Sequence, residues 1–219
     1  MRDLYVSQLE RLKTEIVEMS VLCQEALEKA SAALLEGDEA KANEALAYSV
    51  LIDDKEYVVE ALCSSLILQQ QPVAGDYRLI STSSKIVGNL SRIGTQAVDI
   101  GEIVLRKEYN KRPVTLDYFK ELAKDAQKMI HDVMQAFEEK NVLLAREVKA
   151  YDDVVDEHFY KTKHNLAGML KQADSREETD YALDLLMIDK YYERIGDHVV
   201  KIAEAVEYYV TNQMPKAND

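Results

Sequence analysis

The stretch Tyr191–Glu204, which reads YYERIGDHVVKIAE, has two chemically different faces if it forms a helix. At about 100° per residue, Glu193, Asp197 and Glu204 fall on one stripe, and Asp189 joins them one turn earlier. The opposite side is apolar and carries Ile188, Ile195, Val199, Ile202 and Val206. Neighbouring carboxylates on one stripe repel each other by roughly 0.2–0.5 kcal/mol per pair. We therefore expect either that water solvates this face or that a bound cation offsets the repulsion.

The composition favours an all-helical protein with a well-filled core. The 219 residues include only seven Gly and three Pro, and 47% are hydrophobic. The formal net charge of −13 argues against nucleic acid as a partner, because phosphate backbones are bound by clustered Lys and Arg. It also argues against anionic membrane surfaces and favours cations or a partner with a basic surface.

The sequence features that relate to cellular location favour a soluble, cytoplasmic protein. Cys23 and Cys63 lie inside apolar periodic stretches, so we expect buried free thiols in a reducing compartment. The charged, periodic N-terminus is not typical of a signal peptide. No run approaches the roughly 18 apolar residues that span a bilayer, so direct membrane insertion is not expected.

Apolar residues recur at alternating intervals of three and four, which is the seam of a packed helix. In the first half this spacing predicts helices over about 2–36, 39–70 and 77–109. Gly37 and Asp38 provide a stop and the next N-cap, and Gly75-Asp76 is expected to cap the third helix. In the second half Ser175 and Glu178 form a capping box before a helix that runs to about residue 212.

The second half of the chain repeats the first. Shifting Phe119, Leu122, Ala126, Met129, Val133 and Ala136 back by 103 residues gives Ile16, Met19, Cys23, Ala26, Ala30 and Ala33. At a shift of 102, Arg194-Ile-Gly196 matches Arg92-Ile-Gly94. Such a match indicates an internal duplication. It predicts two pseudo-symmetric three-helix bundles, over 1–109 and 115–212, with a linker at 110–114 and a frayed tail at 213–219.

Candidate metal ligands are concentrated in the second half. Asp152/Asp156 and Glu193/Asp197 are carboxylate pairs spaced by four residues on neighbouring helices, and oxygen ligands suit Mg, Mn, Ca or Fe. The first half has Ser49, Ser91 and Thr95 at the places of Asp152, Glu193 and Asp197. Any metal centre should therefore be asymmetric and stronger in the second half, with His198 as one further candidate ligand.

The two mid-helix glycines, Gly94 and Gly196, cost about 1 kcal/mol each relative to alanine. Their equivalent positions suggest close helix–helix approach, with a backbone hinge as the alternative. Tyrosines beside acids are expected to cover bundle edges with their hydroxyls in water. The tyrosines beside acidic residues are Tyr57, Tyr151, Tyr160, Tyr191 and Tyr192.

No catalytic constellation is visible, and we assign no catalytic residue. The Glu-x-x-His hallmark of ferritin-type di-iron proteins is absent at all four histidines. Neither a Ser/His/Asp or Cys/His arrangement nor a Gly-rich phosphate loop is evident. The histidines are expected at the surface or at helix ends.

These motifs resemble those of the PhoU family, the phosphate-signalling accessory proteins of bacteria. The resemblance lies in ERIGD…IAE at Glu193–Glu204, in its altered copy at Ser91–Glu102, and in QQQPVAGDYR at Gln69–Arg78. It covers nearly the whole chain. It implies two pseudo-symmetric three-helix bundles and a cytoplasmic, non-enzymatic regulator of phosphate homeostasis.

The resemblance also implies partners and a cofactor. Such proteins negatively control a high-affinity phosphate ABC transporter and the phosphate-starvation two-component system, through the transporter ATPase and the phosphate-sensing histidine kinase. Family members bind multinuclear metal clusters through E/D-x-x-x-D motifs, which here are Glu193/Asp197 and Asp152/Asp156, with Fe, Mn, Zn or Mg as candidate metals. The alternative is a metal-binding enzyme or storage protein of helical-bundle type. The apolar seams bury a core within each bundle, so a homodimer is allowed but not required.

Overall fold

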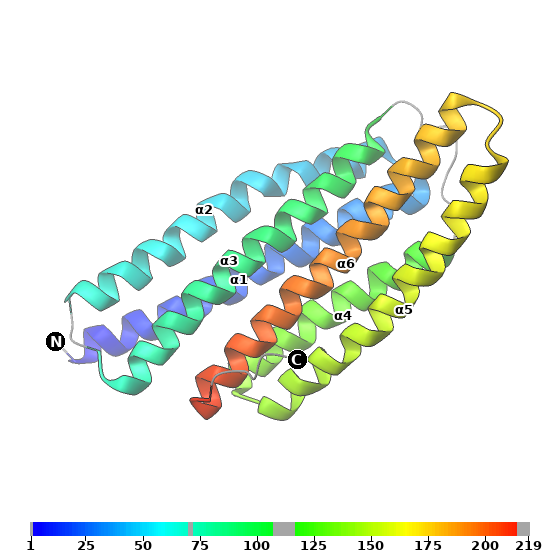
Figure 1. Cartoon of the computed structure of the whole chain (residues 1–219). Coiled ribbons are helices and arrows are strands. Elements are labelled where there is room, and N and C mark those ends of the chain that lie inside the picture. Colours follow the sequence, from blue (N-terminus) through cyan, green and yellow to red (C-terminus); the bar gives the residue numbers. More distant parts are fainter. Residues whose placement is uncertain (1, 70–71, 107–116, 214–219) are drawn as a thin grey trace.

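The computed structural model describes residues 2–69, 72–106 and 117–213, and every regular element in these ranges is an α-helix (Figure 1). The helices are α1 (Arg2–Glu36), α2 (Glu39–Gln69), α3 (Ala74–Val104), α4 (Asp117–Glu139), α5 (Val142–Gln172) and α6 (Arg176–Thr211). The all-α prediction is confirmed. The predicted linker at 110–114 and most of the predicted tail lie outside the described residues.

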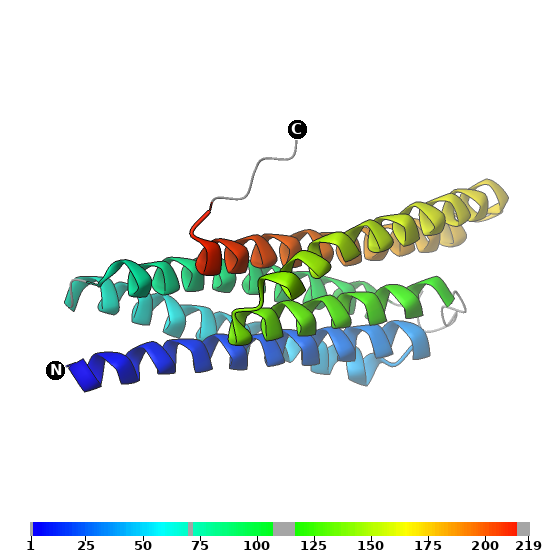
Figure 2. The same ribbon diagram turned by 90° about the horizontal axis from the view of Figure 1, so that it is seen from below.

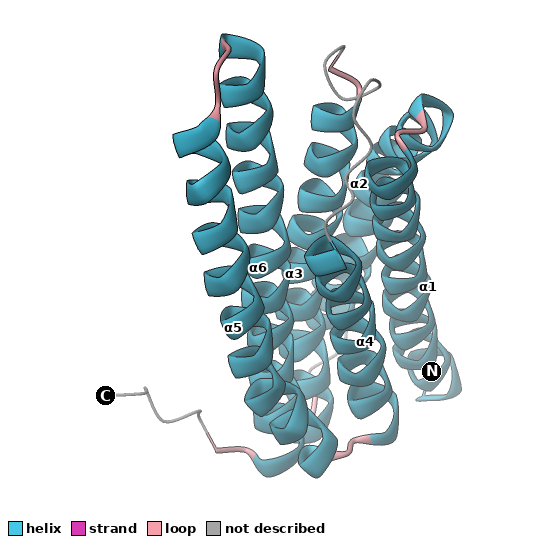
Figure 3. Ribbon diagram, turned by 90° about the vertical axis from the view of Figure 1, so that its right-hand side faces the viewer, coloured by secondary structure: helices cyan, strands magenta, loops and turns pink. Residues whose placement is uncertain are grey.

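The helices form two three-helix bundles, as the duplication predicts. α1, α2 and α3 pack on one another, and so do α4, α5 and α6 (Figure 3). The bundles meet through equivalent helices, because α1 packs against α4 and α3 packs against α6. The bundles lie side by side along an elongated molecule (Figure 2). Contacts between equivalent helices of the two halves are expected when the halves are related by a pseudo-twofold axis.

Two hydrogen bonds between the bundles lie between helices of opposite halves, and one of them joins residues that are each other's counterparts. The Gln127 side-chain amide of α4 donates to the main-chain oxygen of Gln24 on α1, at 2.7 Å, and the two residues are related by the shift of 103. Tyr192 and Ser31 share a buried hydrogen bond of 2.7 Å between their hydroxyls, which links α6 to α1. The prediction that Tyr192 covers a bundle edge is therefore wrong, since its side chain is fully buried between the bundles.

The core consists of the predicted seams. In α1 and α4 every residue of the two matched sets is buried: Ile16, Met19, Cys23, Ala26, Ala30 and Ala33, and Phe119, Leu122, Ala126, Met129, Val133 and Ala136. Burying one such aliphatic or aromatic side chain contributes roughly 1.5–3 kcal/mol. Packing of the amphipathic faces, more than helix propensity, therefore holds these long helices together.

Both cysteines are buried free thiols, as predicted. The Cys23 thiol donates to the main-chain oxygen of Leu90 at 3.2 Å. Burial raises the pKa of Cys23 to about 12 and that of Cys63 to about 11. Neither thiol is activated as a nucleophile or metal ligand, because both roles need the thiolate.

Most helix boundaries follow the predicted caps. Asp38 accepts from the Ala40 amide at 2.8 Å, and Ser175 accepts from the Glu178 amide at 3.1 Å. The prediction for α3 is wrong at its start. Its N-cap is Val73, in extended conformation and without a side-chain cap, so Gly75 and Asp76 lie within the first turn. An acid there interacts favourably with the helix dipole without capping the helix.

None of the described helices combines the length and apolar character needed to cross a bilayer.

Candidate functional site on the carboxylate faces of α5 and α6

The two faces predicted for α6 are present. Ile188, Ile195, Val199, Ile202 and Val206 are all buried. The carboxylates on the other stripe differ widely in exposure. Asp197 is exposed, whereas Glu193 and Glu204 are half-buried. At the near end of the stripe Asp189 is 0% exposed.

Asp189 does not fit the expectation of a solvated acidic face. Neither of its carboxyl oxygens has a hydrogen-bond partner within the described residues. Burial raises its pKa to about 8, the charge of Glu193 adds to this, and Lys163 and Lys190 oppose it. The side chain is therefore largely protonated at neutral pH. The equivalent residue of the first half, Val87, is also fully buried, so this position belongs to the core in both bundles.

Asp152 brings the two predicted carboxylate pairs together. It is half-buried on α5, and burial raises its pKa to about 6. The charge of Asp156 on the same helix raises the pKa further, and so do those of Asp197 and Glu193 on α6. The pairs on α5 and α6 therefore face a common region of negative potential. Such a region attracts a cation or a basic group.

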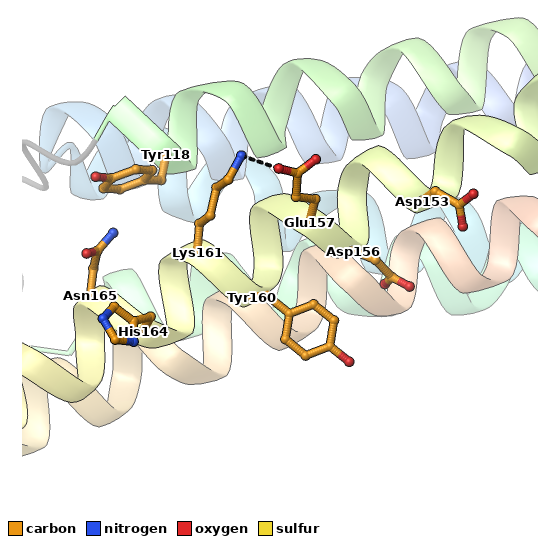
Figure 4. Close-up of a pocket in the computed structure, with 8 residues that line it drawn as sticks. All are labelled: Tyr118, Asp153, Asp156, Glu157, Tyr160, Lys161, His164 and Asn165. Carbon is orange, nitrogen blue, oxygen red and sulfur yellow. Dashed lines mark ion pairs between the residues drawn. The ribbon is translucent and has the colours of Figure 1, made fainter.

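Glu193 and Asp156, two of the three other acids of the pairs, have different surroundings. Glu193 forms an ion pair with Lys190 one turn earlier on α6. Asp156 is exposed and, with Asp153, lines an open cavity of about 590 Å³ along α5. Figure 4 shows Tyr118 of α4 and Tyr160 of α5 in the same cavity wall. Asp156 is thus reached from solvent, whereas Asp152 lies against α6.

The mid-helix glycines permit close approach, as predicted. A Cβ atom at Gly196 would lie 2.9 Å from Oδ1 of Asp152, so the missing side chain makes room for this carboxylate. A Cβ atom at Gly94 would lie 2.6 Å from Cδ1 of Ile52 on α2. A glycine at the equivalent position therefore leaves space for a carboxylate in the second bundle and for an apolar side chain in the first.

The first bundle lacks the equivalent charge. Thr95 donates from Oγ1 to the main-chain oxygen of Ser91 at 3.0 Å, so its hydroxyl is satisfied within α3. The carboxylates of Asp53 and Glu102 are exposed. The chemistry of α2 and α3 therefore differs from that of α5 and α6, as the sequence predicts.

The donors on α5 and α6 have the oxygen chemistry that hard and borderline cations prefer. In 2–69, 72–106 and 117–213, no three or more His, Cys, Asp or Glu side chains are grouped in an arrangement that could hold a metal ion. The residue set suits a cation in chemistry, but its side chains are not arranged for one.

Two histidines have structural partners that the sequence did not reveal. His198 has its Nδ1 3.0 Å from Oδ1 of Asn89 on α3, which places the ring at the bundle interface. Burial lowers the pKa of His198. His158 has its Nδ1 2.8 Å from Oδ2 of the buried Asp125. Both rings are half-buried, so they are less exposed than the expected surface or helix-end histidines.

The cluster around Asp125 was missed by the sequence reasoning. Tyr151 donates its hydroxyl to Oδ1 of Asp125 at 2.8 Å, which raises the pKa of Tyr151 to about 12. One signal was available: Tyr151 and His158 are spaced by seven on α5, so they lie on one face of that helix. Because Asp125 has partners for both oxygens, the cluster serves as a buried structural network.

The architecture defines a class of protein: a duplicated three-helix bundle with a carboxylate-rich face in one copy. The PhoU domain profile matches the chain twice, over residues 16–104 and 119–206. The chain therefore belongs to the PhoU family.

Two relatives and one solved structure match this chain over nearly its full length. The phosphate-specific transport system accessory protein PhoU homolog 1 of Methanothermobacter thermautotrophicus is 32% identical over 98% of this chain and 97% of its own length. The homolog of Clostridium acetobutylicum is 30% identical over 100% of this chain and 99% of its own length. The crystal structure of PhoU from Pseudomonas aeruginosa has a TM-score of 0.85 at 25% identity, and covers 95% of this chain and 100% of that one.

Proposed function

We propose that this chain is a non-enzymatic accessory regulator of a phosphate-specific transport system that acts through protein–protein contacts. The observation that carries the proposal is the end-to-end match to relatives named as accessory proteins of such systems. The described side chains support it, since the buried Cys23 and Cys63 thiols and the hydrogen-bonded His158 and His198 have structural environments. The long helical faces offer broad surfaces for partners.

The finer proposal concerns the direction of control and the partners. We infer negative control of a high-affinity phosphate ABC transporter and of the phosphate-starvation two-component system. The partners would be the transporter's ATPase subunit and the phosphate-sensing histidine kinase, which places the chain in the cytoplasm. The net charge of −13 supports partners with basic contact surfaces.

A capture experiment tests these partners. The tagged chain is incubated with membranes from phosphate-replete cells, and bound proteins are compared with those captured by an unrelated helical bundle of similar net charge. We expect the transporter ATPase and the sensor kinase on this chain alone, with recovery falling as salt rises. Recovery of neither protein, or equal recovery on both baits, would contradict the proposed contacts.

We further propose a multinuclear Fe, Mn, Zn or Mg site on Asp152, Asp156, Glu193 and Asp197. The raised pKa of Asp152, caused by burial and by its acidic neighbours, supports a region where a cation would be stabilised. A bound cation would supply charge neutralisation and would join α5 to α6. Its role would be to fix the surface that α5 and α6 present to a partner.

Elemental analysis after chelation and reloading tests the metal proposal. We expect stoichiometric metal in the wild-type chain and its loss in Glu193→Ala/Asp197→Ala. The matched control is Asp53→Ala/Glu102→Ala, which removes two exposed acids from the first bundle. Equal metal content in the two double variants would contradict the assignment.

The alternative function is metal-dependent catalysis or metal storage on the same carboxylates. The convergence of Asp152 with Asp197 and Glu193 is the observation that favours it. Metal-dependent turnover of a phosphoester or redox substrate, lost in Glu193→Ala/Asp197→Ala, would support it. Inertness of the metal-loaded chain across such a panel would leave the regulator as the better account.

A further inference from the structure

A cavity of about 460 Å³ lies between the two bundles, away from the carboxylates of α5 and α6. It is formed by α1, the first turns of α3, the α4–α5 turn and the end of α6, and Figure 1 shows the start of α3 and the end of α6 toward the same end of the molecule. The polar side chains in its wall are Glu10, Lys13, Asp76, Arg78, Lys140 and Tyr209.

Two cations in this wall have no carboxylate partner among the described residues. Lys13 is neutralised by Glu10, with Nζ 2.7 Å from Oε1. By contrast, Nε of Arg78 is buried and has no hydrogen-bond partner. Lys140 lies over the ring of Tyr209, with Nζ 5.3 Å from the centroid. Acids outnumber Lys and Arg by 40 to 27 in this chain, so unpaired cations around one cavity indicate an external anion.

The internal duplication provides a comparison for Lys140. The residue has a φ of 54°, in the left-handed region that disfavours side chains other than glycine. Its counterpart at the shift of 103 is Gly37, with a φ of 67° in the equivalent turn. A glycine would therefore meet the backbone requirement at residue 140 without strain. The exposed Lys140 side chain lines the cavity despite that backbone cost.

The start of α3 also differs from the start of α6, its counterpart, in its N-cap and in its charge. The N-cap of α6 is Ser175, whose side chain accepts from the Glu178 amide, and the first turn carries Glu177 and Glu178. The N-cap of α3 is Val73, which makes no side-chain cap. Asp180, the counterpart of Arg78 at the shift of 102, carries the opposite charge. The end of α3 that borders the cavity therefore has no side-chain cap, and it carries the acid Asp76 in its first turn as well as the cation Arg78.

A buried hydroxyl lies close to the same place. Tyr5 is only 8% exposed, and its hydroxyl has no hydrogen-bond partner among the described residues. Its pKa is raised by burial and by the charge of Asp76, which itself lines the cavity. The surroundings thus hold two buried polar groups without partners, Arg78 Nε and Tyr5 Oη, next to Lys140 and to a helix start without a side-chain cap.

We propose that this cavity binds a phosphate group, either as inorganic phosphate or as the terminal phosphate of a nucleotide. Arg78 and Lys140 would neutralise it, and the amides at the start of α3 would donate to its oxygens. Asp76 selects for phosphate over sulfate, because hydrogen phosphate carries a proton that a carboxylate accepts and sulfate carries none at neutral pH. The bound group would touch both bundles.

Calorimetric titration of the full chain at constant ionic strength tests this proposal. The probes are inorganic phosphate, ADP and sulfate. We expect saturable binding of one phosphate group per chain, with sulfate at least tenfold weaker. Arg78→Gln and Lys140→Gly should each weaken binding at least tenfold, whereas Lys120→Gln, which removes an exposed lysine outside the cavity, should leave it unchanged. Lys140→Gly is expected to fold because Gly37 occupies the equivalent turn of the first bundle with a similar φ.

The outcomes separate cleanly. Binding of ADP without binding of phosphate assigns the group to a nucleotide, and binding of phosphate alone assigns it to the free ion. No saturable binding of either, equal binding of sulfate, or unchanged affinity in both Arg78→Gln and Lys140→Gly would overturn the proposal. A signalling role for the bound phosphate rests on the proposed regulatory function, but binding is measured on the isolated chain. The two can therefore fail independently.

Discussion

Replacing Asp189 by valine should stabilise the protein. The side chain is fully buried, and neither carboxyl oxygen has a partner among the described residues. Val87 stands at the equivalent position of the first bundle and is also fully buried, so the fold accepts valine in this place. Asp189→Val removes an unsatisfied polar group from the core and adds apolar surface there.

The magnitude follows from the pKa of the buried carboxyl, which rises from 3.8 to about 8 on folding. The folded chain therefore binds a proton that the unfolded chain has released, and stability falls as pH rises between these two values. At pH 7 this costs on the order of 4 kcal/mol, and relaxation around the group lowers the figure. We expect Asp189→Val to raise the free energy of unfolding by about 2–4 kcal/mol at pH 7.

Urea unfolding of the wild type and of Asp189→Val, followed by circular dichroism from pH 4.5 to 8.5, measures this difference. The pH-dependent part of the gain should fall below about 1 kcal/mol at pH 4.5 and level off above pH 8. Asp54→Val, at an exposed position on α2, is the control and should show no such trend. A gain that did not change with pH, or a loss of stability at pH 7, would refute the reasoning.

Three further outcomes can be measured. Gly94→Ala should lower the free energy of unfolding by about 1–3 kcal/mol, since the new Cβ would meet Cδ1 of Ile52 at 2.6 Å; no change in a urea titration would contradict that contact. Tyr192→Phe should cost about 1–3 kcal/mol by the same measurement, because it leaves the buried Ser31 hydroxyl without its partner. The Cys23 thiol should react with iodoacetamide only as the chain unfolds, so rapid modification of the native protein at pH 8 would contradict its burial.

The sequence was sufficient for the features that depend on periodicity. The three–four spacing identified the buried residues of α1 and α4, and the duplication predicted that the bundles are related by symmetry. The repeated mid-helix glycines predicted the close helix–helix approaches at Gly94 and Gly196, because a mid-helix glycine at both equivalent positions needs a packing reason.

The parts that could not be predicted depend on how helices pack in three dimensions. The periodicity of α6 placed Asp189 on the acidic stripe, but it could not show that this end of the stripe is buried. Tyr192 reads as an edge tyrosine until the contact with α1 supplies a partner for its hydroxyl. The Asp125 cluster joins residues from two helices whose relative register the sequence does not state. Burial of polar side chains is thus the property that required the structure.

The pairing of α1 with α4 and of α3 with α6 also determines which helices are free to diverge. α2 and α5 make their main contacts within their own bundles, so the pseudo-twofold interface places few constraints on their outer faces. After duplication each could therefore acquire its own recognition chemistry. Two partners held on these faces would be kept at a fixed separation by a rigid body, and each would raise the effective concentration of the other.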